Sequence, residues 1–350
     1  MLRRKFITTS LAAFAAPLSG FAYIPRRFST RAVDLVTESN VIDMLGLLTL
    51  NWSRLAQWQQ ASSAFTEAEF HKLLSSGICV FHPAVAFVTP QSYEITRDWF
   101  VKWNRLITEH PNYFVRVDCP NDLTRAKQQG RIGIILGMQD ANHFRGVDDV
   151  DLFYTMGQRL TQLTYNAGNL LGDGCHVSHD RGLTPFGEQI VARMNALGMA
   201  IDVSHCGQRT SLDAIAASEK PVLITHSNCL ALAHGVARCK SDEVIRAAAR
   251  NGGVLGITAV RHFVNPTGRA TVEDVLDHFD HAIRLVGVEH VGLGSDFDLD
   301  EHPTYDIAGL NHSDRVYELT EGLLRRGYSD ADVELLLGGN FQRALRQIWK

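Results

Sequence analysis

The sequence predicts one α/β domain folded as a (β/α)8 TIM barrel. Short apolar runs typical of strands buried on both faces recur along the chain, and helical segments separate them. Strands that alternate with helices favour a parallel sheet. The length of 350 residues is compatible with a single barrel that carries some additional segments.

Nine apolar runs are candidate strands, one more than a barrel needs, so one of them is expected to be peripheral or not to form. Helices are predicted between them at residues 188–196, 212–217, 242–250 and 272–285. No repeat or Pro-rich linker divides the chain. The candidate strands cover residues 41–43, 78–81, 114–117, 132–138, 160–165, 200–205, 222–226, 254–259 and 291–296.

The N-terminus is typical of an export signal. Residues 3–7 (RRKFI) form a twin-arginine pattern, and the modestly apolar stretch 8–22 is too short, and too interrupted by Pro17, to span a bilayer stably. We expect residues 1–22 to be a signal and residues 23–350 to be the exported, periplasmic barrel domain, with no stable membrane span after signal removal. An uncleaved anchor is the alternative.

Composition excludes some partners. The formal charge of -4 is small, and Lys and Arg are scattered, so the sequence gives no case for nucleic acid. The six cysteines permit disulfides in an exported protein, but no pair has metal-binding spacing, and we expect mostly free thiols.

Two histidines each end a predicted strand. His205 closes the run at 200–205, and His226 closes the run at 222–226. The carboxyl ends of barrel strands meet at the mouth of the barrel, where this fold carries its chemistry. Two imidazoles from adjacent strands suit one transition-metal ion. The alternative is a pair of structural histidines.

Several motifs occur in a fixed order along the chain, at residues 182–187, 194–195, 201–205, 225–228, 252–256, 292–298 and 338–341. In this set the chain resembles the membrane (renal-type) dipeptidase family of zinc peptidases, family M19, over most of residues 41–345. The resemblance implies a TIM barrel of the metal-dependent hydrolase (amidohydrolase-like) type with two zinc ions, a small-molecule substrate such as a dipeptide, and a possible homodimer.

The resemblance also implies roles for individual residues. His205 and His226 would bind one zinc ion, and Asp296 would be the general acid and base. Arg238 would bind the substrate carboxylate, since a guanidinium meets a carboxylate bidentately. The alternative for Arg238 is a solvated surface arginine.

Four positions depart from the family pattern. Leu45 and Leu47 stand where the family has the His and Asp that bind the other zinc ion, and aliphatic side chains cannot coordinate a metal. Gln139 replaces the bridging Glu, and Tyr165 replaces the histidine that steadies the tetrahedral intermediate. We therefore expect one Zn²⁺ ion, held by His205, His226 and Gln139; Asp140 or Asp296 is the alternative to Gln139, and water would complete the shell.

The predicted function is hydrolysis of dipeptides or related small amides by a metal-activated water. Asp296 would move the proton and Tyr165 would donate to the developing oxyanion. The alternative is a non-hydrolytic relative, either a pseudoenzyme that binds a small ligand or a tailoring enzyme for an exported metabolite.

Overall fold

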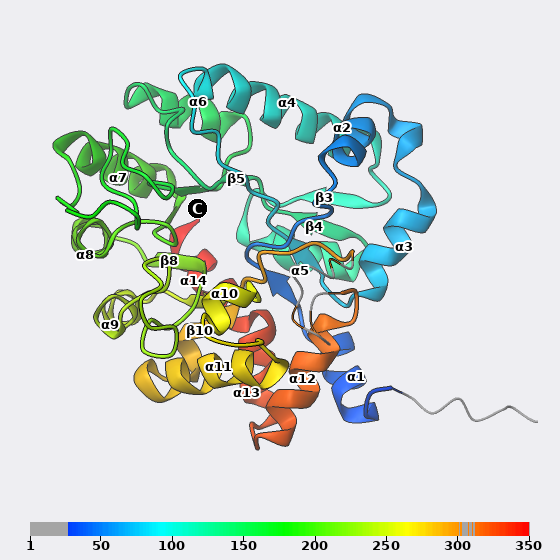
Figure 1. The fold of residues 1–350 in the computed structure, drawn as a ribbon. Helices are drawn as coiled ribbons and strands as arrows, with labels where there is room; N and C mark the ends of the chain where they lie inside the picture. Colours follow the sequence, from blue (N-terminus) through cyan, green and yellow to red (C-terminus); the bar gives the residue numbers. More distant parts are fainter. Residues whose placement is uncertain (1–26, 301, 303–306, 308–309, 311, 350) are drawn as a thin grey trace, which may run out of the picture.

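Helices surround a central ring of strands in the computed structural model of the protein (Figure 1). The structure describes residues 27–300, 302, 307, 310 and 312–349. The predicted signal at residues 1–22 therefore lies outside the described residues.

The strands are parallel and form two hydrogen-bonded sheets, ordered β1-β2-β4-β3 and β10-β9-β8-β7-β6-β5. The sheets join at one seam because β5 continues the line of β4. They join at the other where the Met44 amide donates to the Leu293 carbonyl and the Leu47 amide to that of Phe297, both at 3.0 Å. The ring comprises β1 (Ile42–Asp43), β2 (Val80–Phe81), β4 (Ile132–Ile134) with β5 (Gly137–Met138), β6 (Leu160–Gln162), β7 (Ala200–Asp202), β8 (Val222–Ser227), β9 (Leu255–Ile257) and β10 (Val291–Leu293).

One of the nine predicted strands lies outside this ring, as expected. It is β3 (Phe114–Arg116), which pairs only with the first half of the β4–β5 strand. Strands β6, β7 and β10 end three residues before their predicted ends. The reason is that the chain leaves the hydrogen-bonded ladder there to build the mouth of the barrel.

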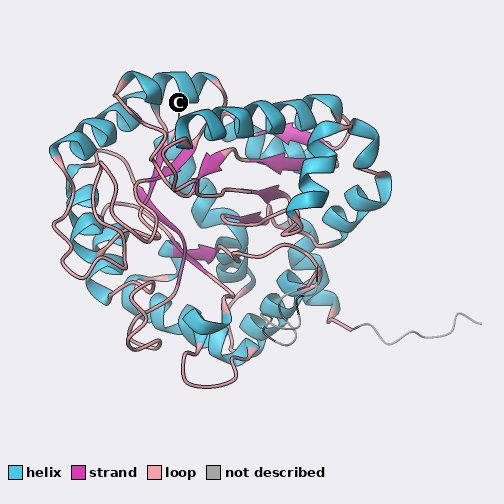
Figure 2. Ribbon diagram, turned by 45° about the horizontal axis from the view of Figure 1, so that its top comes forward, coloured by secondary structure: helices cyan, strands magenta, loops and turns pink. Residues whose placement is uncertain are grey.

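The helices form a layer outside the strands (Figure 2). The four predicted helices are confirmed within α7, α8, α9 and α11. Among the described residues, no helix combines the length and apolar character that crossing a membrane requires. The α-helices are α1 (Thr30–Glu38), α2 (Trp52–Gln60), α3 (Glu67–Ser75), α4 (Ser92–Glu109), α5 (Pro120–Gln128), α6 (Asp148–Thr155), α7 (Pro185–Leu197), α8 (Gln208–Ala217), α9 (Asp242–Arg250), α10 (Arg261–Val264), α11 (Val272–Val286), α12 (Arg315–Arg325), α13 (Asp330–Glu334) and α14 (Asn340–Ile348).

The last helix, α14, covers the amino ends of the strands. Phe341 and Leu345 on this helix pack in one buried cluster with Ile42, Leu160 and Leu223 from three barrel strands. This end of the barrel is therefore filled with apolar side chains, and only the carboxyl ends of the strands are left to form a site. All six cysteines are free, as the sequence analysis expected.

Candidate metal centre and active site

His205 and His226 face each other at the mouth of the barrel. His205 lies in the turn after β7 and His226 lies near the end of β8, and their Nε2 atoms are 3.1 Å apart. Two nitrogens that ligate one tetrahedral zinc ion at ~2.0–2.1 Å would lie ~3.3 Å apart. The pair therefore has the spacing of two ligands to a single ion.

The other ring nitrogen of each histidine is held by an acceptor. Nδ1 of His205 donates to Oδ1 of Asn166 at 2.7 Å. Nδ1 of His226 lies 2.8 Å from the Thr225 hydroxyl, which itself donates to the Asp202 carboxylate at 2.7 Å. Because that hydroxyl proton is already engaged, the His226 nitrogen is the donor. Both rings are thereby oriented with an unprotonated Nε2 toward the other ring, as metal-binding histidines commonly are.

The electrostatic environment favours neutral rings. Burial, reinforced by the positive charge of Arg238, lowers the pKa of both His205 and His226 well below the usual value. Two Nε2 lone pairs that face each other at 3.1 Å repel unless a cation lies between them. The donor set therefore fits a divalent ion that accepts imidazole nitrogen, such as zinc.

Asp296, the predicted acid and base, lies at the mouth in the loop after β10, a strand that β9 separates from β8. Within the described residues it is the one non-glycine with positive φ, at 63°, a conformation that is uncommon for non-glycine residues and often marks functional positions. Its amide donates to the Leu45 carbonyl at 2.8 Å. Burial raises the pKa of its carboxyl to about 7, with Arg238 opposing that rise and Asp43 adding to it.

Arg238 is buried, so the alternative of a solvated surface arginine is wrong. Its guanidinium donates to the carbonyls of Ser204 at 2.7 Å and His226 at 2.8 Å, which ties it to the strands that carry both histidines. Its Nε has no hydrogen-bond partner among the described residues. The side chain can therefore brace the histidines and still offer one N–H to a ligand.

The other two predicted site residues differ in their relation to the pair. Tyr165 stacks on His205, with ring centroids 4.2 Å apart and planes at 21°, and burial raises the pKa of its phenol, so the hydroxyl stays protonated. Gln139 donates through its side-chain nitrogen to the Ala84 carbonyl at 2.8 Å. No contact that the structure describes joins Gln139 to either histidine, so its role as a ligand remains a prediction.

Two cavities meet at Asp296. One, of about 530 Å³, is lined by Tyr165, His205, Arg238 and Asp296 among others. The other, of about 480 Å³, is lined by Leu50, Val260, Arg261, His262, Asp296, Phe297 and His302. The structure thus brings four of the six predicted site residues to one cavity, with His226 adjacent through its contact with His205.

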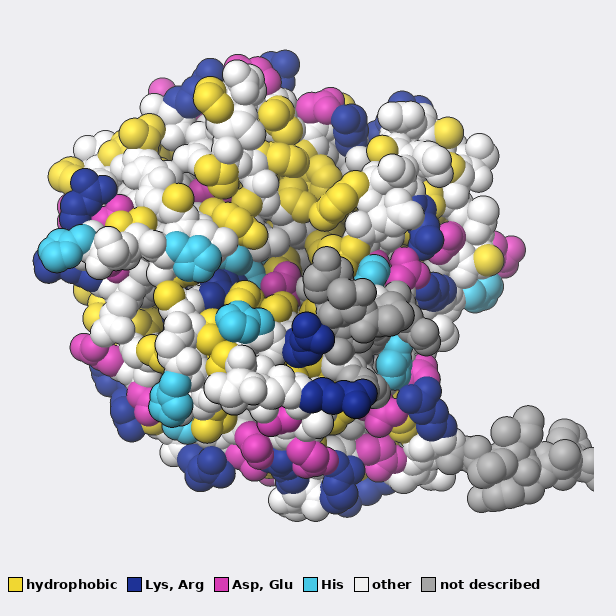
Figure 3. Space-filling model, viewed as in Figure 1, with side chains coloured by type: hydrophobic (Ala, Val, Ile, Leu, Met, Phe, Trp, Pro, Cys, Tyr) yellow, Lys and Arg dark blue, Asp and Glu magenta, His cyan; other side chains and the backbone are white. Residues whose placement is uncertain are grey.

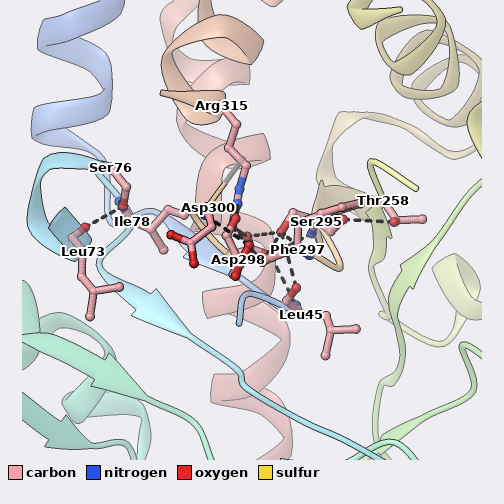
Figure 4. Close-up of polar contacts among 11 residues, drawn as sticks. Leu45, Leu73, Ser76, Ile78, Thr258, Ser295, Phe297, Asp298, Asp300 and Arg315 are labelled. Carbon is pink, nitrogen blue, oxygen red and sulfur yellow. Dashed lines mark hydrogen bonds and ion pairs between the residues drawn. The ribbon is translucent and has the colours of Figure 1, made fainter. Parts of the chain in front are cut away.

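The β1–β10 side of the mouth is built differently. Leu45 and Leu47 are 0% and 6% exposed, so apolar side chains fill the end of the first strand. Beside them, fully buried Asp43 and Arg315 form an ion pair at 2.8 Å, and Asp43 also accepts from the amide and hydroxyl of Ser295 at 2.8 and 2.6 Å. Figure 4 shows Leu45, Ser295, Phe297 and Arg315 gathered at this seam.

Within the described part of the chain, no group of three or more His, Cys, Asp or Glu side chains is placed to hold a metal. An ion at the histidine pair must therefore complete its coordination with water, an amide oxygen or substrate. Sequence reasoning missed Asn166 and Thr225, which orient the pair. It also missed Asp202, although an acid inside an apolar strand signals a buried polar network.

Comparison with known proteins gives consistent matches. The profile of the membrane dipeptidase family, peptidase family M19, matches residues 29–350. The chain is 32% identical to an uncharacterized dipeptidase of Schizosaccharomyces pombe over 261 residues, 70% of this chain and 59% of the relative. It is 31% identical to the dipeptidase aclJ of Aspergillus oryzae over 266 residues, 73% of this chain and 62% of the relative.

The chain therefore spans about 60% of the length of these curated relatives. Among solved structures, an amidohydrolase from Pseudomonas aeruginosa is 28% identical, with a TM-score of 0.80 over 91% of this chain and 99% of that one. The match of the family profile to nearly the whole described chain settles the classification: the chain belongs to the membrane dipeptidase family, peptidase family M19.

Proposed function

We propose that this protein is a metal-dependent hydrolase that cleaves dipeptides or related small amides and uses one zinc ion. The observation that carries the proposal is the His205–His226 pair, whose Nε2 atoms face each other at 3.1 Å with both Nδ1 atoms held by acceptors. Membership of the dipeptidase family supports the reaction class.

His205 and His226 would hold the ion, and the side-chain oxygen of Gln139 is the proposed third ligand. A zinc ion bound there supplies Lewis acidity, which lowers the pKa of water and polarises a carbonyl. Leu45 and Leu47 stand where the family pattern has ligands of a second zinc ion. This supports the proposal of one zinc ion per chain.

The chain's own residues supply the proton transfer and the substrate orientation. Asp296, with a pKa of about 7, would accept the water proton and return it to the leaving nitrogen. The free Nε–H of Arg238 would hold the substrate carboxylate. The protonated phenol of Tyr165, stacked on His205, would donate to the developing oxyanion.

The second candidate is a non-hydrolytic protein that binds a small ligand or tailors an exported metabolite. The observation in its favour is Arg238, which uses two guanidinium nitrogens on the carbonyls of Ser204 and His226. An arginine tied to the scaffold in this way is less free to clamp a carboxylate bidentately than one whose guanidinium is unengaged.

Turnover by zinc-loaded protein separates the two candidates. The purified chain is equilibrated with zinc, freed of excess metal and assayed against a panel of dipeptides and N-acyl amino acids. Release of free amino acid that disappears with a chelator and returns with zinc supports hydrolysis. Zinc binding without release of amino acid from any of these amides contradicts it and favours the binding protein.

A further inference from the structure

We propose that the substrate is an N-acyl amino acid with an apolar acyl group, rather than a dipeptide with a free ammonium group. This inference rests on the proposed function and names the substrate class for the same site. The 480 Å³ cavity beside Asp296 carries the argument, and we refer to it as the acyl cavity.

The position of the acyl cavity assigns it to the acyl half of the substrate. Asp296, Val260 and His262 line both the acyl cavity and the 530 Å³ cavity that contains Arg238. A substrate whose carboxylate meets Arg238 must present its amide to Asp296, where the two cavities join. The group on the carbonyl side of that amide then extends into the acyl cavity.

The lining residues of the acyl cavity that pack into the fold are apolar. Phe297 is buried, and Leu50 packs against the core as a partly buried residue. Leu50 is tied to the loop after β10 because its amide donates to the Asp298 carboxylate at 2.5 Å. Such walls favour aliphatic or aromatic groups, which gain free energy when they leave water.

The charges around the acyl cavity disfavour an ammonium group. Among the described residues that line it, Asp296 is the one carboxylate, and the proposed mechanism uses that group for proton transfer. Arg261 and His262 add basic side chains at its exposed rim. A free α-amino group would meet the guanidinium of Arg261 and, among the described lining residues, no carboxylate other than Asp296, whereas an acylated nitrogen or a plain acyl chain needs no such acceptor.

Apolar residues that follow the first strand also favour an acyl group. Leu45 and Leu47, just after the first strand, are buried apolar residues, and Trp52, at the start of α2, is 51% exposed. Figure 3 shows hydrophobic side chains gathered on the face above the hollow at the centre of the molecule. Apolar surface on this face would favour acyl chains that extend beyond the cavity.

The reaction balances without any further reactant. Water adds across the amide, so that its oxygen forms a bond to the acyl carbon while the carbon–nitrogen bond breaks. The nitrogen leaves with one proton from water, and the products are a carboxylic acid and a free amino acid.

The test uses three substrates that share one leaving amino acid, each in both enantiomers: glycyl-alanine, acetyl-alanine and hexanoyl-alanine. For zinc-loaded protein we expect kcat/KM for hexanoyl-alanine to exceed that for glycyl-alanine by at least about tenfold, because burial of the chain adds affinity. A kcat/KM for glycyl-alanine equal to or above that for hexanoyl-alanine overturns the inference and leaves the proposed function intact.

A binding titration of the metal-free protein with hexanoyl-alanine and glycyl-alanine keeps the inference testable without turnover. Tighter binding of hexanoyl-alanine by about tenfold or more supports the acyl cavity even if no amide is cleaved. In that case the proposed hydrolysis fails while the ligand class stands. Equal or weaker binding of hexanoyl-alanine overturns the inference.

Two variants at one position sharpen the assignment. Leu50→Asp places a carboxylate in the acyl cavity, and Leu50→Asn places a neutral group of the same size there. We expect Leu50→Asp to shift the preference toward glycyl-alanine by at least about tenfold more than Leu50→Asn does, with thermal unfolding used to verify that both variants fold. The same shift in both variants contradicts the assignment.

Discussion

The two sides of the barrel mouth differ in the partners of their buried polar side chains. On the β7–β8 side, the described contacts of Asp202, Thr225 and Asn166 orient two imidazoles toward one point. On the β1–β10 side, Asp43 forms a buried ion pair with Arg315, and the buried side chains of Leu45 and Leu47 follow the first strand. Both sides contain a buried carboxylate, but only one of them uses it to prepare metal ligands.

If the protein binds one ion, as proposed, this contrast explains how the other metal site is absent while the fold is kept. The Asp43–Arg315 pair, together with the hydrogen bonds from Ser295 to Asp43, joins β1 to β10 and α12 without needing an ion. The seam is therefore closed by protein groups alone. The histidine pair, in contrast, brings two lone pairs together and favours a cation.

The largest effect is expected from a substitution in the histidine pair on the β7–β8 side. His205→Ala removes one imidazole of the pair, and we expect zinc binding to be lost and kcat/KM to fall at least about a thousandfold, or ~4 kcal/mol of transition-state stabilisation. Zinc content and amide turnover are measured together. His71→Ala, at an exposed histidine on α3, is the control and should retain both. Turnover that survives in His205→Ala would rule out the proposed site.

The next effect concerns the β1–β10 side and falls on stability. Arg315→Met leaves Asp43 buried without its partner, which is expected to cost about 3–5 kcal/mol of unfolding free energy. Denaturant unfolding measures the loss, and Asp43→Asn combined with Arg315→Met should recover part of it. Arg325→Met, which removes an exposed pair with Glu273, should cost no more than about 1 kcal/mol. Equal losses of unfolding free energy for Arg315→Met and Arg325→Met would show that the buried pair does not stabilise the β1–β10 seam more than an exposed pair does.

A smaller effect tests the orientation of His205. Asn166→Leu removes the acceptor for Nδ1 at similar volume, and we expect zinc affinity to fall about 10–100-fold, with little change in the free energy of unfolding of the metal-free protein. Competition with a chelator measures the affinity, and Asn121→Leu at an exposed position is the control. Unchanged affinity in Asn166→Leu would show that the His205 ring needs no such support.

The smallest expected effect is the pH dependence that Asp296 gives to stability. Its pKa is raised from 3.8 to about 7, so the native state binds more protons than the unfolded state between these values. Its contribution to stability therefore falls as the pH rises through that window.

In metal-free protein, Asp296→Asn should raise Tm relative to the parent by an amount that grows, on the order of 2–4 °C, between about pH 5 and pH 8. Asp98→Asn, at an exposed carboxylate on α4, should show no such trend. A Tm difference for Asp296→Asn that stays constant with pH would mean that Asp296 is not the group that titrates.

Much of the architecture could be predicted from the sequence because barrel strands are local apolar runs. The run at 200–205 and the run at 222–226 each place a histidine at a strand end, and parallel strands bring such ends together. The surplus strand could also be expected, although only the pairing showed that it is Phe114–Arg116.

The surroundings of the site could not be predicted because they depend on contacts between distant residues. Asp43 and Arg315 are 272 positions apart, and neither flanking sequence identifies the other. Arg238 is buried because its guanidinium donates to the carbonyls of Ser204 and His226, which lie in two other segments. The acyl cavity likewise joins the segment before α2, the start of α10 and the loop after β10, which no local pattern relates.

The number of zinc ions bound per chain tests the central claim most directly. The full-length protein is equilibrated with zinc, dialysed and analysed by elemental mass spectrometry. We predict about one ion per wild-type chain and none in His205→Ala. Two ions per chain, or one ion that persists in His205→Ala, would contradict it.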